Sequence, residues 1–164
     1  MLNEKVLDAL NAQINHELYS AYLYLSMSAH FEAVSLPGFA KWTRLQAAEE
    51  NTHAMKFYDF VNDRGGRVVL QAIAQPPVEF GAPLEIFIAI LEHEQKVTGL
   101  IHQLYETAVK AKDYPTQVML HWFINEQVEE EKNATEIVEQ LRMMENHQGN
   151  IIHIDRHLGK RGED

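Results

Sequence analysis

The 164-residue chain contains no cysteine. This absence excludes a disulfide framework, thiolate zinc sites and cysteine-ligated iron–sulfur clusters, and it suits the reducing cytoplasm, where we expect the protein to reside. Long apolar runs are also missing, because the longest, Ile86 to Leu91, is far short of the roughly 20 residues that span a bilayer. The N-terminal residues Met1 to Val6 show no basic region followed by an apolar block. We therefore expect no signal peptide and no membrane partner.

Basic residues are few. Lys and Arg number 14 against 24 Asp and Glu, which gives a formal net charge of −10. Such a charge argues against a nucleic-acid partner, whose phosphates need a basic surface, and it favours the accumulation of cations. Apolar residues make up 46% of the chain, so its composition is that of a folded protein. The length predicts a single domain over residues 1–164.

Four long segments show apolar residues at a period of about 3.6, and nothing in them favours strands. Asn3 is a candidate N-cap, Pro37 marks the start of the second segment and Gly65-Gly66 its end. Helices this long need one another's apolar faces, so the pattern predicts an all-α four-helix bundle. The expected helices are 3–32, 37–64, 83–111 and 114–144, followed by a short fifth helix over 150–159.

The connections predict the topology. Short links join the first helix to the second and the third to the fourth, so both pairs should be antiparallel hairpins. Between the hairpins lie the 17 residues from Gly66 to Ala82, which can extend about 55 Å, more than the roughly 40–45 Å of such helices. A long crossover can therefore let the second and third helices run parallel. The fifth helix is too short to join the packing along its length, so it should cap the bundle or meet another subunit.

Charged residues repeat along the chain at positions on the core-facing sides of the expected helices, where apolar residues would otherwise be expected. Two hairpins with inward carboxylates at matching heights would form one polar site inside the bundle. Buried carboxylates repel each other and lose hydration, so such a cluster needs cations. The repeat therefore predicts a metal site. At a distance of 77 residues, His16-Glu17 recurs as His93-Glu94 and Glu49-Glu50 as Glu126-Gln127, with 33 residues from Glu17 to Glu50 and from Glu94 to Gln127.

The first half of the repeat has the stronger ligand pattern. Glu50 and His53 lie one turn apart on the same helix face, and Glu17 and Glu94 occupy matching places on two core stripes. Di-iron carboxylate bundles use one Glu from each of two helices and Glu-x-x-His from each of the other two. Carboxylate-rich ligation with one imidazole suits Fe(II).

The second half departs from this pattern, because Gln127-x-x-Glu130 stands where a second Glu-x-x-His would be. The two metal positions should therefore be unequal, and the second should bind its ion more weakly because Gln127 is neutral. One position would use Glu17, Glu50 and His53, and the other Glu94 with Glu50 as a bridge and Glu130 or Gln127 nearby.

Several segments resemble the prokaryotic non-haem ferritins over nearly the whole chain: Asn15–Leu25, Glu49-Glu50, Arg64-Gly-Gly, Glu92-His-Glu and Glu126–Lys132. The resemblance implies a ferritin-like bundle, 24 copies in a hollow shell, and storage of iron oxidised with O₂ or H₂O₂. It also implies a ferroxidase centre and a third iron position nearby. The centre would comprise Glu17, Glu50, His53, Glu94 and Gln127 with Glu130 adjacent, the third position Glu49, Glu126, Glu129 and Glu130, and the aromatic neighbours Tyr24 and Trp122.

Other readings differ in specific residues. Bacterioferritins bind haem through a methionine after the second-helix carboxylate, where this chain has Asn51, so we expect no haem. Rubrerythrins usually carry a cysteine-ligated iron domain, which this chain cannot have. A di-iron oxidase or peroxidase without storage, and a helical interaction protein of the cytokine kind, remain as alternatives. His153 and His157 lie one turn apart and could share an ion or be structural.

Overall fold

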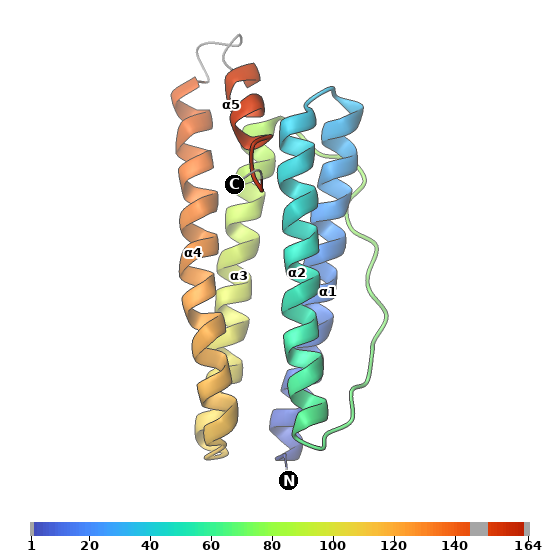
Figure 1. Cartoon of the computed structure of the whole chain (residues 1–164), viewed down its shortest axis with the longest axis vertical. Helices are drawn as coiled ribbons and strands as arrows, with labels where there is room; N and C mark the ends of the chain where they lie inside the picture. Colours follow the sequence, from blue (N-terminus) through green and yellow to red (C-terminus); the bar gives the residue numbers. More distant parts are fainter. Residues whose placement is uncertain (1, 145–150, 163–164) are drawn as a thin grey trace.

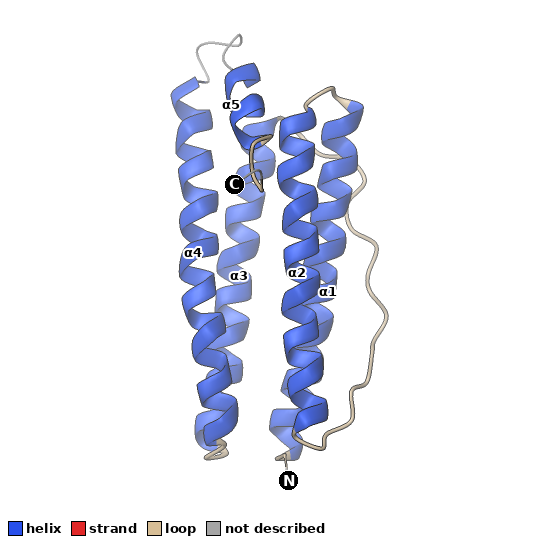
Figure 2. Ribbon diagram, viewed as in Figure 1, coloured by secondary structure: helices blue, strands red, loops and turns tan. Residues whose placement is uncertain are grey.

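The computed structural model describes residues 2–144 and 151–162, and it confirms the all-α four-helix bundle with a short fifth helix (Figure 1). The described residues contain no strand, as Figure 2 shows. The observed bounds agree with the expected ones to within a residue or so, and Asn150 lies outside the described residues. No helix in the described ranges is long and apolar enough to cross a membrane. The helices are α1 Glu4–Ala33, α2 Pro37–Asp63, α3 Pro83–Lys110, α4 Tyr114–Met144 and α5 Ile151–Leu158.

The helix ends follow from local chemistry. The side chain of Asn3 accepts a hydrogen bond from the Lys5 N–H at 3.0 Å and so caps α1. Proline occupies the first position of both α2 and α3, where its missing N–H has no cost. After α2, Gly65 adopts a φ of +69°, the left-handed conformation that commonly ends a helix.

The crossover from α2 to α3 runs along the outside of α1 for most of the bundle length (Figure 1). As a result α2 and α3 run parallel, as the length of the connector predicts. Polar side chains of α1 hold the crossover in place. Asn11 donates to the Arg67 carbonyl at 3.1 Å, and Ser26 donates to the Pro77 carbonyl at 2.8 Å.

The apolar core consists of two clusters, one toward each end of the bundle. Phe31 and Phe39 stack in the cluster near α5, with ring centroids 5.1 Å apart. Phe57 and Phe123 stack in the other cluster, at 4.0 Å. On every long helix, buried polar residues lie between the positions that belong to the two clusters. The middle of the bundle is therefore a polar layer enclosed by apolar packing.

The α5 helix docks on the end of α2. Its Asp155 carboxylate accepts hydrogen bonds from the N–H groups of Gly38 and Phe39, at 2.8 and 3.0 Å, and so caps α2 from a distant part of the chain. The contact requires glycine, because a Cβ on Gly38 would lie 1.7 Å from the Asp155 carbonyl oxygen. Ile154 and Leu158 bury their side chains in the adjacent apolar cluster.

Candidate metal centre

All four long helices contribute side chains to the polar layer. Its six innermost members are almost completely buried, with exposures of 2 to 5%. Two lie on α2, two on α4, and one each on α1 and α3. These are the residues that the 77-residue repeat singles out: Glu17, Glu50, His53, Glu94, Gln127 and Glu130.

An inner group combines Glu17 of α1 with Glu50 and His53 of α2. One ligand atom from each lies within 4.8 Å of the other two, and all three side chains are buried. The His53 Nδ1 atom is 3.4 Å from Glu50 Oε2. Two carboxylates and an imidazole at these distances can hold a metal ion, and the one-turn spacing of Glu50 and His53 is what places both on the same face of α2.

An outer group extends from the same histidine toward the surface. Glu49, His53, Glu126 and Glu130 also offer ligand atoms within 4.8 Å of one another. Here His53 turns its other nitrogen outward, with Nε2 3.7 Å from Glu126 Oε1. Glu49 and Glu126 are partly exposed, whereas His53 and Glu130 are buried. The imidazole thus lies between a buried group and a group at the rim.

Glu94 stands apart from both groups in the described part of the chain. Its carboxylate accepts hydrogen bonds from the Tyr24 hydroxyl and from the Gln127 side-chain nitrogen, the second at 3.3 Å. Gln127 also donates to Thr98 Oγ1 at 3.3 Å. The replacement of a second Glu-x-x-His therefore has a structural consequence, because the amide nitrogen of Gln127 supports the Glu94 carboxylate as a hydrogen-bond donor. The role of Gln127 as a metal ligand stays a prediction.

Burial and mutual repulsion oppose ionisation of the carboxyl groups. Burial, and then the charge of Glu50, raises the pKa of Glu17 well above its usual range. Burial and Glu50 likewise raise the pKa of Glu94 to about 8, while burial with Glu94 and Glu50 raises the pKa of Glu130 to about 8. A divalent ion would compensate both effects, because it displaces the protons and neutralises the charges of the buried carboxylates.

His53 and Tyr24 respond to the same charges. Burial alone would lower the pKa of His53, but the contact with Glu50 and the charges of Glu130 and Glu126 outweigh it, and the net shift is upward. Burial, followed by the charge of Glu94, raises the pKa of Tyr24 well above its usual range, so its hydroxyl remains a donor.

Two glutamines that support the carboxylates are not among the sequence-based candidates. Gln46 is completely buried and donates to Glu50 at 3.1 Å and to Glu130 at 2.9 Å. Gln13 donates to Glu17 at 2.7 Å. In both helices the glutamine lies four residues before the glutamate, and this Gln-x-x-x-Glu spacing is the signal that could have found them.

Other candidate residues lie at the edge of the centre or away from it. Glu129 is exposed and joins neither group, so its place in the third position stays a prediction. Trp122 is 39% exposed and packs edge-on against the His53 ring, with centroids 5.4 Å apart. His153 and His157 are exposed on α5, and neither belongs to a group of metal-ligand side chains in the described ranges.

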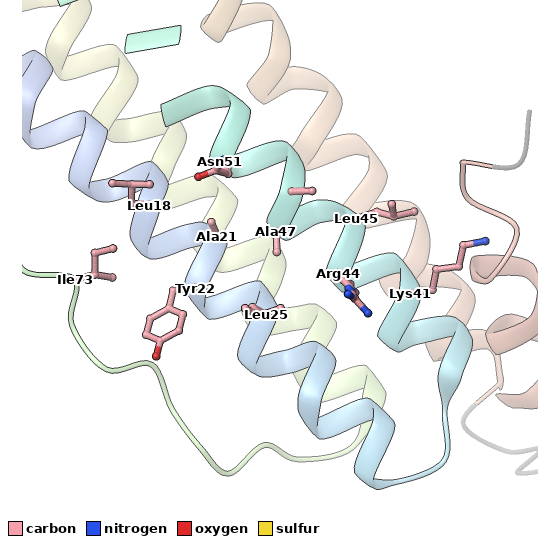
Figure 3. Close-up of a pocket in the computed structure, with 11 residues that line it drawn as sticks. Leu18, Ala21, Tyr22, Leu25, Lys41, Arg44, Leu45, Ala47, Asn51 and Ile73 are labelled. Carbon is pink, nitrogen blue, oxygen red and sulfur yellow. The ribbon is translucent and has the colours of Figure 1, made fainter. Parts of the chain in front are cut away.

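A surface groove lies outside the bundle, between α1, α2 and the crossover (Figure 3). Leu18, Tyr22 and Leu25 of α1 line it with Ile73 of the crossover. Asn51 also lines this groove, and its side chain is exposed whereas the neighbouring Glu50 is buried. None of the inner or outer group belongs to the groove, so it is separate from the metal centre.

Comparison with known proteins agrees with this architecture. The sequence profile of the Ferritin-like domain family matches residues 7–144. The chain is 47% identical over 131 residues to a bacterial non-heme ferritin of Staphylococcus saprophyticus, covering 80% of this chain and 78% of the relative. It is 40% identical over 161 residues to that of Bacteroides fragilis, covering 98% of this chain and 100% of the relative.

Solved structures give the same result. An open pore ferritin from the hyperthermophilic archaeon Archaeoglobus fulgidus superimposes with a TM-score of 0.96 at 48% identity, over 98% of both chains. A humanized archaeal ferritin superimposes with a TM-score of 0.97 at 47% identity, over 98% of this chain and 99% of the other. The chain therefore belongs to the ferritin family, together with the non-haem ferritins of prokaryotes.

Proposed function

We propose that the protein captures Fe(II) in the cytoplasm, oxidises it with O₂ or H₂O₂ and stores the ferric product inside a hollow shell of 24 copies. The observation that carries the proposal is the inner group. Glu17, Glu50 and His53 offer three ligand atoms within 4.8 Å in the buried middle of the bundle. Glu94 and Glu130 contribute further carboxylates to the same polar layer. Iron here is the substrate.

In this proposal the inner group and the Glu94 side of the layer each take one Fe(II), and Glu50 bridges them. Each Fe(II) gives up one electron, so the pair supplies the two electrons that reduce H₂O₂ to water or O₂ to peroxide. The raised pKa values of Glu94 and Glu130 mean that binding releases protons from these groups. The carboxylates then stabilise the higher charge of the ferric product.

The outer group supports a third iron position on the way out of the centre. It shares His53 with the inner group and adds the partly exposed Glu49 and Glu126. Glu129, an exposed residue of α4 like its partly exposed neighbour Glu126, belongs to this position in our proposal. Because the outer group is more accessible to water, it should exchange its ion faster than the inner group.

The surface groove supports assembly into the shell. Tyr22 is 49% exposed and Leu25 is 47% exposed, and both line a groove whose other members are mostly apolar. Its polar members are Lys41, Arg44 and Asn51. Large apolar side chains at such exposure indicate a protein–protein contact, and we propose that a second copy of the chain covers them. The number of 24 copies comes from the family resemblance.

The test is a comparison of Fe(II) oxidation in two variants, Glu50→Gln and Glu92→Gln. The first removes the bridging charge while keeping the shape of the side chain. The second changes an exposed glutamate of α3 that belongs to neither ligand group. In stopped-flow assays we expect Glu50→Gln to slow the initial oxidation by more than about tenfold and the control to leave it unchanged. An unaltered rate in Glu50→Gln would remove this centre from the mechanism.

Particle size after iron loading tests the storage step separately. A shell-sized particle that retains iron is the expected result. A monomer or dimer that oxidises iron and retains none would instead identify an oxidase or peroxidase of the di-iron type.

A further inference from the structure

Arg161, three residues beyond α5, reaches back to the rim of the metal centre. Its guanidinium donates to Glu49 Oε2 at 2.7 Å and to Gln46 Oε1 at 2.9 Å. It also stacks over the Trp42 ring, 4.6 Å from the centroid, and donates to the Trp42 carbonyl at 3.3 Å. One side chain from the C-terminal segment therefore contacts α2 at three successive turns.

The contact is anchored by the residues before it. Asp155 caps α2 through two backbone N–H groups, and Lys41 donates to the Gly159 carbonyl at 2.7 Å. Because these bonds hold the chain on both sides of the α5 end, Arg161 starts from a defined position. Its side chain is 28% exposed, so the guanidinium is partly shielded from solvent.

Two of its partners belong to the metal centre. Glu49 is a member of the outer group, and its bond to Arg161 engages one of its two carboxylate oxygens. Gln46 accepts from Arg161 through its oxygen, so its nitrogen is left to donate to Glu50 and Glu130. Arg161 thus neutralises a ligand at the rim and orients an amide that holds two ligands inside.

We infer that Arg161 is a positioning residue that competes with the outer metal ion for Glu49, so that binding of an ion there displaces the guanidinium from Glu49 and Trp42. The inference rests on the outer group being a metal position, as proposed above. A cation tethered at 2.7 Å from a ligand oxygen must weaken the attraction of the group for a further cation. The C-terminal segment would therefore set how readily the outer group fills, while the inner group keeps its own affinity.

The experiment is a calorimetric titration of the metal-free protein with Zn²⁺, which binds without redox chemistry. The variants are Arg161→Met, Arg161→Lys and the matched control Arg156→Met, which removes the same charge from an exposed position of α5. Glu49→Gln identifies the binding class that belongs to the outer group. We expect Arg161→Met to tighten that class by roughly three- to tenfold and to leave the tighter, inner class within about twofold.

The control variants separate charge from structure. Arg161→Lys retains a cation beside Glu49 and should bind Zn²⁺ like the unaltered protein, as should Arg156→Met. Combined with Glu49→Gln, the Arg161→Met change should have no further effect, because its target is gone. An outer class that is unchanged or weakened in Arg161→Met, or equally tightened in Arg156→Met, would overturn the inference.

Fluorescence gives a second readout. In a Trp122→Phe background, Trp42 is the remaining tryptophan, and filling the outer class with Zn²⁺ should change its emission as the guanidinium leaves the ring. The same titration with Arg161→Met should leave the emission constant, and a constant emission with Arg161 present would contradict displacement. If no variant shows the inner class, the proposed function itself fails. An intact inner class without an effect of Arg161→Met defeats only the present inference.

Discussion

Glu130→Gln should stabilise the metal-free protein at about pH 8 and have little effect at about pH 4. Glu130 is buried, and its pKa is raised from 4.5 to about 8. Below its unfolded pKa the group is protonated in both the folded and the unfolded chain, so it costs no stability there. As the pH rises toward about 8, the carboxyl group of the unfolded chain loses its proton first. Folding must then either take up a proton again or bury a charged carboxylate. A neutral amide of the same shape avoids this cost.

The magnitude follows from the same shift. A change in pKa from 4.5 to about 8 corresponds to roughly 5 kcal/mol for an isolated group. Glu94 and Glu50 share the repulsion with Glu130, so the substitution should recover only part of it, about 2–4 kcal/mol. For a chain of this length that is an increase of about 5–15 °C in Tm. The hydrogen bond from Gln46 can persist, because the new side chain keeps an acceptor oxygen.

The assay is thermal unfolding of the metal-free protein, followed by circular dichroism at both pH values. Glu136→Gln is the control, because Glu136 is an exposed residue of α4 whose ion pair with Lys132 spans 3.8 Å. It should change the stability by less than about 0.5 kcal/mol. When the proteins are saturated with Zn²⁺, Glu130→Gln should instead be less stable than the unaltered protein, since it removes a ligand of the outer group. Equal stability of Glu130→Gln and the unaltered protein at about pH 8 would refute the electrostatic reasoning.

Two further predictions concern the cap on α2 and the neighbour of Glu94. Asp155→Ala removes the acceptor for the N–H groups of Gly38 and Phe39. It should therefore lower the free energy of unfolding by about 1–2 kcal/mol and speed hydrogen exchange at these two amides. Unchanged exchange would show that the cap is dispensable. Tyr24→Phe removes a hydrogen-bond donor to Glu94 without changing the packing. Fe(II) oxidation should therefore slow by a factor of about 2 to 10, while the circular dichroism spectrum stays unchanged. An unaltered rate would leave Tyr24 with a packing role only.

The helices and the ligand candidates could be predicted because both depend on local spacing. A period of 3.6 determines which residues share a face, and the 77-residue repeat brings Glu17 and Glu94 to matching heights. The crossover length was enough to predict that α2 and α3 run parallel. These features need only the geometry of a single helix and the reach of an extended chain.

The supporting contacts could not be predicted in this way. Neighbouring positions on a helix differ by about 100°, so the spacing of apolar residues alone does not decide whether Leu45 or Gln46 faces the core. The choice depends on the bonds from Gln46 to Glu50 and Glu130, one of them on another helix. Arg161 lies in a polar segment with no periodicity, and its contacts cross more than a hundred positions of the chain.

The unequal halves of the repeat include one feature that the sequence predicts and others that only the fold reveals. The replacement of a histidine by Glu130 is visible in the sequence and predicts two different metal positions. The role of Gln127 is not visible, because only the fold places its amide nitrogen beside the Glu94 carboxylate and Thr98. Conversely, the two nitrogens of His53 face different groups, which gives the outer group a ligand that the sequence assigned only to the inner one.

The most direct test of the central claim is anomalous diffraction from crystals of the assembled protein soaked anaerobically in Fe(II). The account predicts iron peaks inside each bundle, one held by Glu17, Glu50 and His53 and another on the Glu94 side of Glu50, with a weaker peak at Glu49 and Glu126. Bundles without iron at Glu50 and His53, in crystals that bind it elsewhere on the shell, would contradict the account.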